Sequence, residues 1–544
     1  MKSTITLPEG TQDRLFEECQ ERRQVQNALT GLFQKRGYRE VSTPEVEFYD
    51  LFIQSGSPLP QEQMLKIVDR SGRIMVMRPD CTTPIARMAA AKLKDLSKPQ
   101  HLYYDETVFR SDRQHKGSRG EIAQCGVELL GAQGIEADIK VLTLAADSLE
   151  TAGLSRFHIE IGHMGFFREL TEALGLSKLE TETLRDLMEV KNYAALTDHL
   201  APYLDKAPGR ALYRLPYLFG GVEVLDEAQE LFPDTAVIPY LRTLYQGLTQ
   251  TGDPQRFRFD LGLVHQIDYY TGVIFRGYAQ GAGDAVLSGG RYDNLLSAFG
   301  VDAPATGFAA DVDAICGCLR ERSPAALAQG GEQAPHRLKI ALTKGRLQDK
   351  SVALFERMGL DCEPIKNPGR RLVHALPNYP LDAVLAKAPD VITYVEHGVC
   401  DLGIVGKDTI LEQGSSFYEV LDLGMGRCRF ALAVKEGSDF YGTYKTRRIA
   451  SKYPEVTRAF FEKKGMDVSI IKIEGSVELA PILNLADAIV DIVETGATLR
   501  ENGLVPIEDV AQVSARLIVN TASMKLYKEE ILSFIRQCQE NLEG

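Results

Sequence analysis

Residues 487–499 constrain the fold most, because an apolar run ends there on an acidic turn that contains glycine and threonine. In an extended strand Asp487 and Asp491 lie on one face, and the isoleucine and valine side chains around them can be buried. Backbone N–H groups around Gly496 and the neighbouring threonine hydroxyls can then converge on one phosphate. The stretch predicts a buried strand that leads into a phosphate-binding loop, although the loop alone equally fits an ordinary turn.

Composition narrows the class of protein. A chain of 544 residues exceeds one typical core, so several domains are expected. Its 44% hydrophobic and 25% charged residues are typical of a soluble globular protein, and its net charge of −13 argues against nucleic acid as the main partner. The nine cysteines include no CxxC pair, which favours a reducing compartment. Without an apolar signal segment or a run of about 18 apolar residues, we expect a cytoplasmic protein with no membrane contact.

The N-terminal part of the chain combines helices with strands. Residues 14–36 carry apolar side chains on one helical face and end near Gly37, which predicts a helix. Residues 38–47 are strand-like but contain Pro44, which favours an edge or bent strand. Residues 165–250 have a helical pattern and form an insertion. Residues 74–87 follow, then 101–110 and, after a charged loop, 121–130, a pattern that predicts strand, loop and strand.

This part of the chain contains a set of short motifs: residues 8–13 (PEGTQD), 78–82 (RPDCT), Phe109–Arg110 with Arg119, Gln124 and Glu128, 263–272 (LVHQIDYYTG), 288–293 (SGGRYD) and 306–309 (TGFA). Together they resemble the class II aminoacyl-tRNA synthetases, and specifically the catalytic core of histidyl-tRNA synthetase. The resemblance implies an α+β domain over residues 1–320, built on an antiparallel sheet with helices.

The same resemblance implies an amino-acid pocket that accepts histidine. Asp80 and Thr82 can bind an α-ammonium group, and Arg110 can bind a carboxylate. The residues for an imidazole edge are Gln124, Glu128 and Tyr270, with Tyr269 beside them in the same motif. Any one of these residues is more often a satisfied polar side chain than a ligand-binding one. Together they predict a histidine site.

Three departures argue against a working synthetase. His265 stands where the synthetase motif carries a catalytic arginine, and Ala314 stands where an arginine should hold the ATP phosphates. Each change removes a permanent charge and a bidentate phosphate contact, so adenylate formation should fail. No anticodon-binding pattern follows residue 320. This part therefore resembles the catalytically silent, histidyl-tRNA synthetase-like regulatory subunit of ATP phosphoribosyltransferase, and no tRNA partner is expected.

The sequence pattern changes after residues 321–336, which are rich in Ala, Gly, Gln and Pro and predict a linker. From residue 337 strands and helices alternate, as in parallel α/β units. Glycines or hydroxyl residues with nearby charge follow the expected strands in four loops: residues 343–346, 406–408, 451–453 and 494–498. Ligands bind beyond the carboxyl ends of strands in open parallel sheets, so the four loops together predict a polyphosphate site.

Residues 337–544 resemble the short form of ATP phosphoribosyltransferase. The resemblance implies a two-lobed α/β fold like that of periplasmic binding proteins, with one lobe at about 337–429 plus 517–544 and the other at about 430–516. The stretches that carry it are 344–347 (KGRL), 370–372 (RRL), 393–398 (TYVEHG), 401–408 (DLGIVGKD), 452–454 (KYP), 475–481 (GSVELAP) and 487–499. Gly369 departs from the family's small hydroxyl residue before the double arginine.

The resemblance implies the first step of histidine biosynthesis. ATP condenses with phosphoribosyl pyrophosphate to give N1-phosphoribosyl-ATP and pyrophosphate, with Mg²⁺ bound through the substrate phosphates and no metal ligands from the protein. The positions implied for phosphate neutralisation and turnover are Lys344, Arg346, Arg370 and Lys452. Those implied for ribose, 5-phosphate or nucleotide binding are Glu396, Asp491, Glu494, Thr495, Gly496, Ala497 and Thr498.

The two resemblances together predict an enzyme inhibited by histidine, its pathway end product, and the family suggests a homo-oligomer. An active histidyl-tRNA synthetase with an appended ligand-binding domain is the alternative, which His265 and Ala314 disfavour. A third possibility treats residues 337–544 as a non-catalytic receptor of the periplasmic kind. The phosphate-type loops and the missing secretion signal weigh against a receptor.

Overall fold

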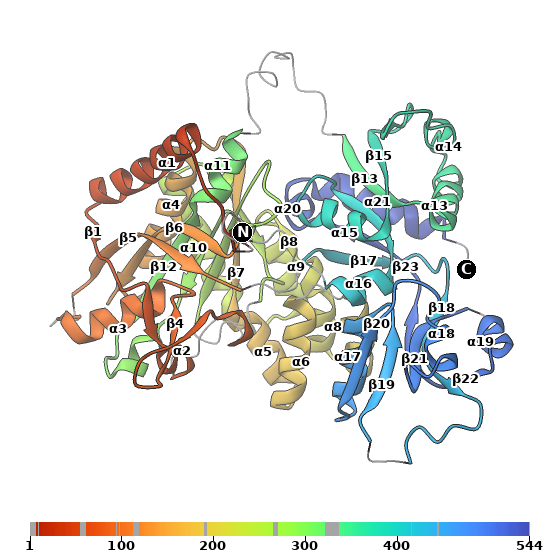
Figure 1. The fold of residues 1–544 in the computed structure, drawn as a ribbon. Helices are drawn as coiled ribbons and strands as arrows, with labels where there is room; N and C mark the ends of the chain where they lie inside the picture. The colour runs from red at the N-terminus through yellow and green to blue at the C-terminus, as the bar shows by residue number, and fades with distance from the viewer. Residues whose placement is uncertain are drawn as a thin grey trace. The chain divides into compact units, whose positions relative to one another are not determined.

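The computed structural model describes residues 7–8, 10–54, 61–93, 95–96, 98–111, 119–189, 193–264, 270–320, 337–414, 416–442, 445–494 and 496–542. The chain divides into two compact units, residues 1–333 and 334–544, and Figure 1 labels the elements of both. The boundary between the units falls within residues 321–336, which lie outside the described residues.

Unit 1 is built around a sheet whose described strands number nine. Their order is β1-β5-β6-β12-β11-β10-β7-β9-β8, and neighbours are antiparallel except for the pairs β1/β5 and β7/β9. The strands are β1 (Arg39–Glu40), β5 (Gln100–Phe109), β6 (Glu121–Leu130), β7 (Phe157–His163), β8 (Phe219–Gly220), β9 (Phe257–Asp260), β10 (Val273–Ala279), β11 (Leu287–Arg291) and β12 (Ala305–Asp311).

Long helices cover this sheet and supply much of the core. Val25, Leu29 and Phe33 of α1 (Phe16–Lys35) are buried, which confirms the predicted helix and its apolar face. The helix ends at Lys35, and Gly37 follows its C-cap Arg36 with a φ of +83° that suits glycine. The other helices that bound the sheet are α3 (Thr82–Lys92), α4 (Ile135–Thr151) and α11 (Val312–Arg320).

The predicted helical pattern of residues 165–250 is confirmed. This region contains α5 (Met164–Leu174), α6 (Lys178–Glu189), α7 (Tyr193–Leu200), α8 (Ala207–Arg214), α9 (Val224–Leu231) and α10 (Val237–Thr251). Leucines of α10 and α8 join the large core that also contains α1 and α4. The helices are therefore an integral part of the unit's core.

Two predictions for the first hundred residues need correction. The strand expected over 38–47 is interrupted, because β1 stops at Glu40 and β2 (Val46–Phe48) pairs with β4 (Ile74–Met77) in a separate small sheet with β3 (Lys66–Val68). Pro44 lies in the interruption, where it has no strand hydrogen bond to break. Within the stretch 74–87 the strand ends at Met77, and the alanine-rich segment from Thr82 forms α3, a helix that was not predicted.

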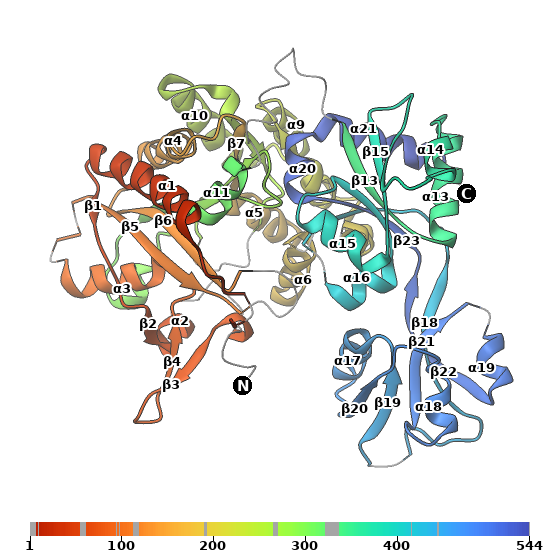
Figure 2. The ribbon, with the colours of Figure 1, turned by 45° about the horizontal axis from the view of Figure 1, so that its top comes forward.

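Unit 2 contains two sheets. The six-stranded sheet has the order β14-β15-β13-β16-β23-β17 and the five-stranded sheet the order β20-β19-β21-β18-β22, counted over the described residues. Figure 2 shows the second group of strands gathered apart from the first. The chain crosses between the two groups at residues 423–427 and again at Ser514. We refer to the two groups, with their helices, as the six-stranded half and the five-stranded half.

The strands of unit 2 are only partly parallel. The pairs β13/β15, β13/β16, β19/β20 and β19/β21 are parallel, while β14, β17, β18, β22 and β23 run antiparallel to their neighbours. The predicted parallel α/β units are present, and both sheets also contain antiparallel strands, because crossing strands return through them. The strands of the six-stranded half are β13 (Leu338–Thr343), β14 (Val373–Ala375), β15 (Leu381–Ala386), β16 (Leu402–Gly406), β17 (Tyr418–Asp422) and β23 (Ala515–Val519).

The five-stranded half contains the stretch with which the sequence argument began. Ala488, Ile489 and Val490 of β21 (Ala488–Val493) are fully buried, which confirms the predicted buried strand, whereas Asp487 and Asp491 are half-buried. The other strands are β18 (Cys428–Lys435), β19 (Arg447–Ser451), β20 (Val468–Lys472) and β22 (Leu504–Val513).

Helices follow the strands in both halves of unit 2. In the six-stranded half they are α13 (Arg346–Arg357), α14 (Glu363–Lys366), α15 (Ala388–Glu396), α16 (Lys407–Gln413), α20 (Thr521–Leu526) and α21 (Lys528–Glu540). In the five-stranded half they are α17 (Pro454–Lys463), α18 (Leu479–Ile482) and α19 (Ala497–Glu501). The predicted helices after β13 and β19 are confirmed as α13 and α17, which end near Gly359 and Gly465.

Candidate active site and ligand pocket

The four predicted loops all follow the carboxyl ends of strands. The loops at 343–346 and 406–408 follow β13 and β16 in the six-stranded half, and those at 451–453 and 494–498 follow β19 and β21 in the five-stranded half. Within each half the two strands concerned are parallel and belong to one parallel set, so both loops lie at the same edge of their sheet. Each half of unit 2 thus presents one edge with two candidate ligand loops.

Two polar contacts join these loops across the halves. Arg346 Nη1 lies 3.4 Å from Glu494 Oε2, and the Tyr453 hydroxyl donates to Asp408 Oδ2 at 3.3 Å. The side chain of Arg346 is 89% exposed and that of Glu494 62%, so their pairing is weak and both remain accessible to a ligand. The structure therefore brings the four loops together in two pairs, each joined by one contact. We refer to the region of these paired loops between the halves as the cleft.

Lys344 and Arg370 lie at the same sheet edge of the six-stranded half. The Lys344 N–H donates to the Ala386 carbonyl at the end of β15 (2.9 Å). Strand β14 runs antiparallel to β15 with Val373 opposite Val384, so the residues just before β14 lie beyond the carboxyl end of β15. Arg370 is one of these residues, and it belongs to an exposed turn. Its position is consistent with a cation that faces the cleft.

The turn around Arg370 explains the glycine that departs from the family pattern. The Arg371 N–H donates to the Pro368 carbonyl at 3.2 Å and closes the turn. Gly369 has φ of +55°, a left-handed conformation that glycine adopts without steric cost. Glycine at this position is therefore required by the turn as it stands.

Lys452 and Asp491 are electrostatic neighbours in the five-stranded half. Burial raises the pKa of the Asp491 carboxyl, nearby Glu478 raises it further, and Lys452 acts in the opposite direction. Asp491 Oδ1 accepts the Ile492 N–H at 2.8 Å. Ser451 anchors the adjacent loop, because its hydroxyl donates to the Val490 carbonyl (2.6 Å) and accepts the Tyr453 N–H (2.9 Å). These contacts fix the position of the chain that carries Lys452.

The loop at 494–498 turns at Gly496, whose φ is +72°, and α19 begins at Ala497. Thr498 and Glu494 are exposed, whereas Thr495 lies outside the described residues. Arg500 is a neighbour that the sequence argument missed, since its Nη1 lies 3.4 Å from the position that a Cβ on Gly496 would take. A cation one helical turn beyond a phosphate-type glycine was a signal available in the sequence.

Glu396 lies away from these loops. It ends α15, and its carboxylate accepts the Ser416 N–H at 3.2 Å and the Ser416 hydroxyl at 3.1 Å. A helix that follows a parallel strand runs back along the sheet, so the end of α15 lies near the amino end of β16, at the edge opposite the loops. Within one chain, Glu396 is separated from the other predicted residues of the cleft.

A second polar site lies in unit 1 around Glu128. This side chain is 1% exposed; Thr82 Oγ1 donates to its Oε1 at 2.7 Å, and the Tyr292 hydroxyl donates to its Oε2. Burial raises the pKa of Glu128 to about 7, with a smaller contribution from nearby Asp80. Gly307 makes room for this carboxylate, since a Cβ there would come within 2.1 Å of Oε2.

Asp80 adds a carboxylate oxygen without a partner to the same site. Its Oδ1 accepts the Thr83 N–H at 2.8 Å, whereas Oδ2 is buried with no hydrogen bond in the described part of the chain. Burial raises the pKa of Asp80, and Arg110 nearby acts in the opposite direction. Arg110 itself donates from Nε to the Pro79 carbonyl at 3.1 Å. A buried acceptor without a partner indicates a place for an external donor such as an ammonium group.

Some of the remaining predicted pocket residues lie near this site, and others lie outside the described residues. Gln124 lies on β6 four residues before Glu128, so the two share a face of the sheet. Tyr270 packs against Gly290, where a Cβ would come within 2.8 Å of the ring carbon Cε1. Tyr269 and His265 lie outside the described residues. Tyr292, which binds Glu128 directly, was present in a quoted motif but was not predicted as a site residue.

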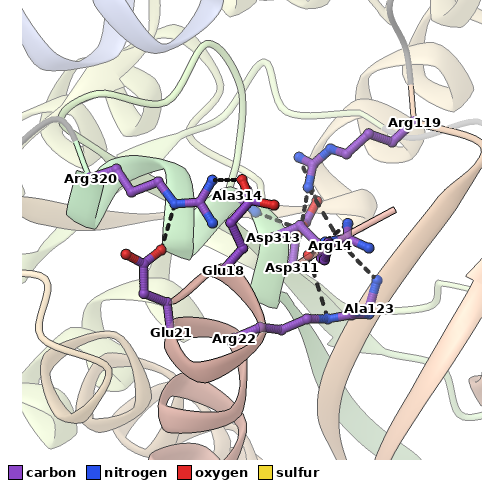
Figure 3. Close-up of polar contacts among 10 residues, drawn as sticks. All are labelled: Arg14, Glu18, Glu21, Arg22, Arg119, Ala123, Asp311, Asp313, Ala314 and Arg320. Carbon is purple, nitrogen blue, oxygen red and sulfur yellow. Dashed lines mark hydrogen bonds and ion pairs between the residues drawn. The ribbon is translucent and has the colours of Figure 1, made fainter. Parts of the chain in front are cut away.

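Ala314 stands at the position where the synthetase motif carries an arginine. Figure 3 shows Ala314 at the start of α11, where its N–H donates to Asp311 Oδ1 at 2.8 Å. Asp311 also pairs with Arg119 at 3.3 Å, and Asp313 pairs with Arg14 at 3.1 Å. Arg119 is thereby neutralised by carboxylates of its own unit. Ala314 supplies no guanidinium for nucleotide phosphates.

The described residues contain no cluster of three or more His, Cys, Asp or Glu side chains able to hold a metal ion. Within the same residues, no helix is both long and apolar enough to cross a membrane. The cysteines of the described chain are free thiols, most of them buried.

The two units define a class of protein: a class II synthetase-like unit with two neighbouring buried carboxylates, Glu128 and Asp80, followed by an α/β unit with four paired strand-end loops. The histidyl-tRNA synthetase family matches residues 10–315, and the ATP phosphoribosyltransferase family matches residues 387–540. The chain belongs to these families, with a unit of the ATP phosphoribosyltransferase regulatory-subunit type followed by a catalytic unit of ATP phosphoribosyltransferase.

Relatives of each unit support this assignment. An ATP phosphoribosyltransferase regulatory subunit of Clostridium kluyveri is 44% identical over 315 residues, which cover 57% of this chain and 81% of the relative. An ATP phosphoribosyltransferase of the same organism is 61% identical over 203 residues, which cover 37% of this chain and 93% of the relative.

Solved structures support the class II synthetase-like fold of unit 1. A Bacillus halodurans structure described as an ATP phosphoribosyltransferase regulatory subunit/histidyl-tRNA synthetase matches with 30% identity and a TM-score of 0.55, and the match covers 71% of this chain and 93% of that one. A histidine–tRNA ligase subunit of Alicyclobacillus acidocaldarius matches with 26% identity and a TM-score of 0.52, covering 59% of this chain and 99% of that one.

Proposed function

We propose that unit 2 condenses ATP with phosphoribosyl pyrophosphate, releasing pyrophosphate and N1-phosphoribosyl-ATP, and that unit 1 binds histidine as the regulatory ligand. The observation that carries the catalytic proposal is the meeting of four strand-end loops from two sheets, marked by the Arg346–Glu494 and Tyr453–Asp408 contacts. This cleft lies in the unit that belongs to the ATP phosphoribosyltransferase family.

The cleft suits a reaction whose barrier is charge separation. N1 of ATP attacks C1 of the ribose while pyrophosphate leaves, so the transition state carries positive charge at the ribosyl centre and growing negative charge on pyrophosphate. Lys344, Arg346, Arg370 and Lys452 neutralise phosphate oxygens in our proposal. Asp491 binds the ribose hydroxyls, and the loop around Gly496 binds the 5-phosphate. Positioning and electrostatic stabilisation then account for turnover without a covalent nucleophile.

We assign Mg²⁺ to the substrate phosphates. When bound there it supplies positive charge to the leaving pyrophosphate. Asp408 and Glu494 supply carboxylates at the paired loops, beside which a metal ion held by substrate phosphates would lie. The protein's own cations at Lys344 and Arg370 complement that charge.

We further propose that the two halves of unit 2 act as the lobes of a binding-protein-like fold, one at about residues 337–429 plus 517–544 and the other at about 430–516. Support comes from the two sheets and from the pair of crossings at residues 423–427 and 514. Substrate binding at the facing strand ends then favours closure of the lobes. Glu396, which lies away from this cleft, is proposed to contact nucleotide only in an assembly of several copies.

The histidine site is proposed around Glu128. Asp80 Oδ2 accepts the α-ammonium, Thr82 lies beside it, and Arg110 binds the carboxylate. Gln124, Glu128, Tyr269 and Tyr270 surround the imidazole in this proposal. The unpartnered Asp80 oxygen and the buried Glu128 carboxylate support it. Histidine inhibits only if it favours one state of the chain over another, because a ligand with equal affinity for both states shifts nothing.

One assay tests both proposals. Pyrophosphate release from ATP and phosphoribosyl pyrophosphate is measured with the purified chain, with and without histidine. We expect turnover that requires both substrates and falls as histidine is added. A chain without turnover would contradict the catalytic proposal, and turnover indifferent to histidine would contradict the regulatory one. A histidine-dependent ATP–pyrophosphate exchange would instead support the synthetase alternative, which Ala314 and the Arg119–Asp311 pair disfavour.

A further inference from the structure

Glu412 joins the two halves of unit 2 at a point that the proposed chemistry does not use. It belongs to α16 of the six-stranded half, and its Oε2 accepts the N–H of Glu455 at 3.0 Å and that of Val456 at 3.2 Å. These two amides lie in the first turn of α17 in the five-stranded half. N–H groups of a first helical turn have no partner within their own helix, so an acceptor from outside satisfies them.

The charge of Glu412 suits this contact. A carboxylate at the N-terminus of a helix is stabilised by the helix dipole and by charge-assisted hydrogen bonds. Burial raises the pKa of Glu412, whereas the two N–H bonds act in the opposite direction. Glu455 and Lys472 are the charged neighbours that face it, with opposite effects. The contact of Glu412 with α17 is therefore a partly buried pair of hydrogen bonds.

Glu412 acts together with Asp408 on the same helix. The two residues are four positions apart in α16, which places them on one helical face. Asp408 accepts the hydroxyl of Tyr453, the residue immediately before α17, and Glu412 holds the first turn of α17 itself. One face of α16 thus contacts a continuous segment, Tyr453 to Val456. Lys452 directly precedes that segment.

The crossings between the halves lie next to the other end of α16. The Lys407 N–H donates to the Ser514 carbonyl at 2.9 Å, and the Ser514 hydroxyl donates to Asp422 Oδ1 at 2.7 Å. Gly424 and Gly426, in the first crossing, have φ of +64° and +63°. Glycines at such angles can absorb backbone rotation without steric cost. Because the crossings fix only one end of α16, Glu412 supplies a second fixed point between the halves.

We propose that Glu412 is a positioning residue that orders the start of α17 against α16 and so places Lys452 at the cleft. The proposal rests on the function assigned to unit 2, in which Lys452 neutralises substrate phosphate. Loss of the Glu412 acceptor leaves two N–H groups of α17 without this partner and weakens the contact between the two halves. Turnover then falls although Glu412 touches no substrate.

The test compares three variants of the full chain. Glu412→Ala removes the acceptor, Glu412→Gln keeps an acceptor oxygen without the charge, and Glu462→Ala removes an exposed carboxylate from the same helix α17 as a matched control. Hydrogen exchange at the amides of Glu455 and Val456 is measured together with kcat and KM for both substrates.

We expect Glu412→Ala to speed exchange at these two amides about tenfold and to lower kcat/KM about tenfold, because hydrogen bonds to a charged group are lost. Glu412→Gln should recover most of both effects, and Glu462→Ala should match the wild type. Unchanged exchange or unchanged kcat/KM in Glu412→Ala would overturn the proposal, as would equal losses in the control. A wild-type chain without turnover would contradict the proposed function, and the exchange comparison alone would then decide whether Glu412 orders α17.

Discussion

At the scale of single residues, Glu128 combines burial with three polar neighbours and a pKa raised to about 7. Between its ordinary pKa of 4.5 and 7 the folded chain keeps a proton that the unfolded chain has lost. The free energy of unfolding should therefore fall as pH rises through this window, by about 3 kcal/mol in total for this group. The group's stabilising contribution is complete below its unfolded-state pKa and is lost as pH passes 7.

This prediction is checked by urea unfolding of the wild type and Glu128→Gln at pH values from 5 to 8, followed by circular dichroism. The difference between the two chains isolates Glu128, since every other titrating group is common to both. We expect the wild-type advantage to shrink across the range. Parallel stability curves would show that Glu128 titrates normally.

Substitutions of Arg370 and Lys452 test the catalytic proposal most directly. Both are surface side chains, so their loss should leave the fold unchanged. Substitution of either by alanine should lower kcat about 100-fold, because in our proposal each supplies charge to phosphate oxygens in the transition state. The matched control is Arg458→Ala, an exposed arginine on α17 that pairs with Glu455 three residues away. Near-normal turnover in both variants, with unchanged Tm, would remove them from the site.

At the scale of elements, Asn520 caps α20 and ties it to α15. Its side chain accepts the Ser523 N–H at 2.9 Å and donates to the Val395 carbonyl at 2.8 Å, and the residue is 1% exposed. Asn520→Ala should destabilise unit 2 by about 2 kcal/mol, because a helix cap and a buried hydrogen bond are lost together. Asn520 adjoins the start of β16, away from the cleft loops. Thermal unfolding should show a lower Tm, while kcat per folded molecule should stay at the wild-type value; a lower kcat would place Asn520 in the catalytic machinery.

Elements with a strong local signal were predictable from the sequence, and contacts between distant elements were not. The apolar periodicity of residues 14–36 and the strand at 488–493 depend on neighbouring residues, and both are confirmed. Helix α3 was not predicted, because its first residues belong to a motif that was expected to form a loop. The Arg346–Glu494 and Tyr292–Glu128 contacts join residues 148 and 164 positions apart, for which no local pattern exists.

At the scale of the whole molecule, each unit contains its own core and its own polar site. The large cluster of unit 1 and the clusters around Ala341 and Phe430 in unit 2 share no residues. In our proposal, histidine binding near Glu128 regulates unit 2 by favouring one state of the chain over another. Such coupling has a thermodynamic consequence that distinguishes it from direct competition.

Coupling between two sites is reciprocal. If histidine lowers the affinity for phosphoribosyl pyrophosphate tenfold, saturating phosphoribosyl pyrophosphate must lower the affinity for histidine tenfold, a coupling free energy of about 1.4 kcal/mol. Calorimetric titration of histidine at rising concentrations of phosphoribosyl pyrophosphate should show Kd rise and then level off. A Kd that rises without limit would indicate competition for one site. Glu128→Gln should bind histidine weakly at every concentration and should escape inhibition, because its carboxylate is lost at the site where the regulatory signal begins.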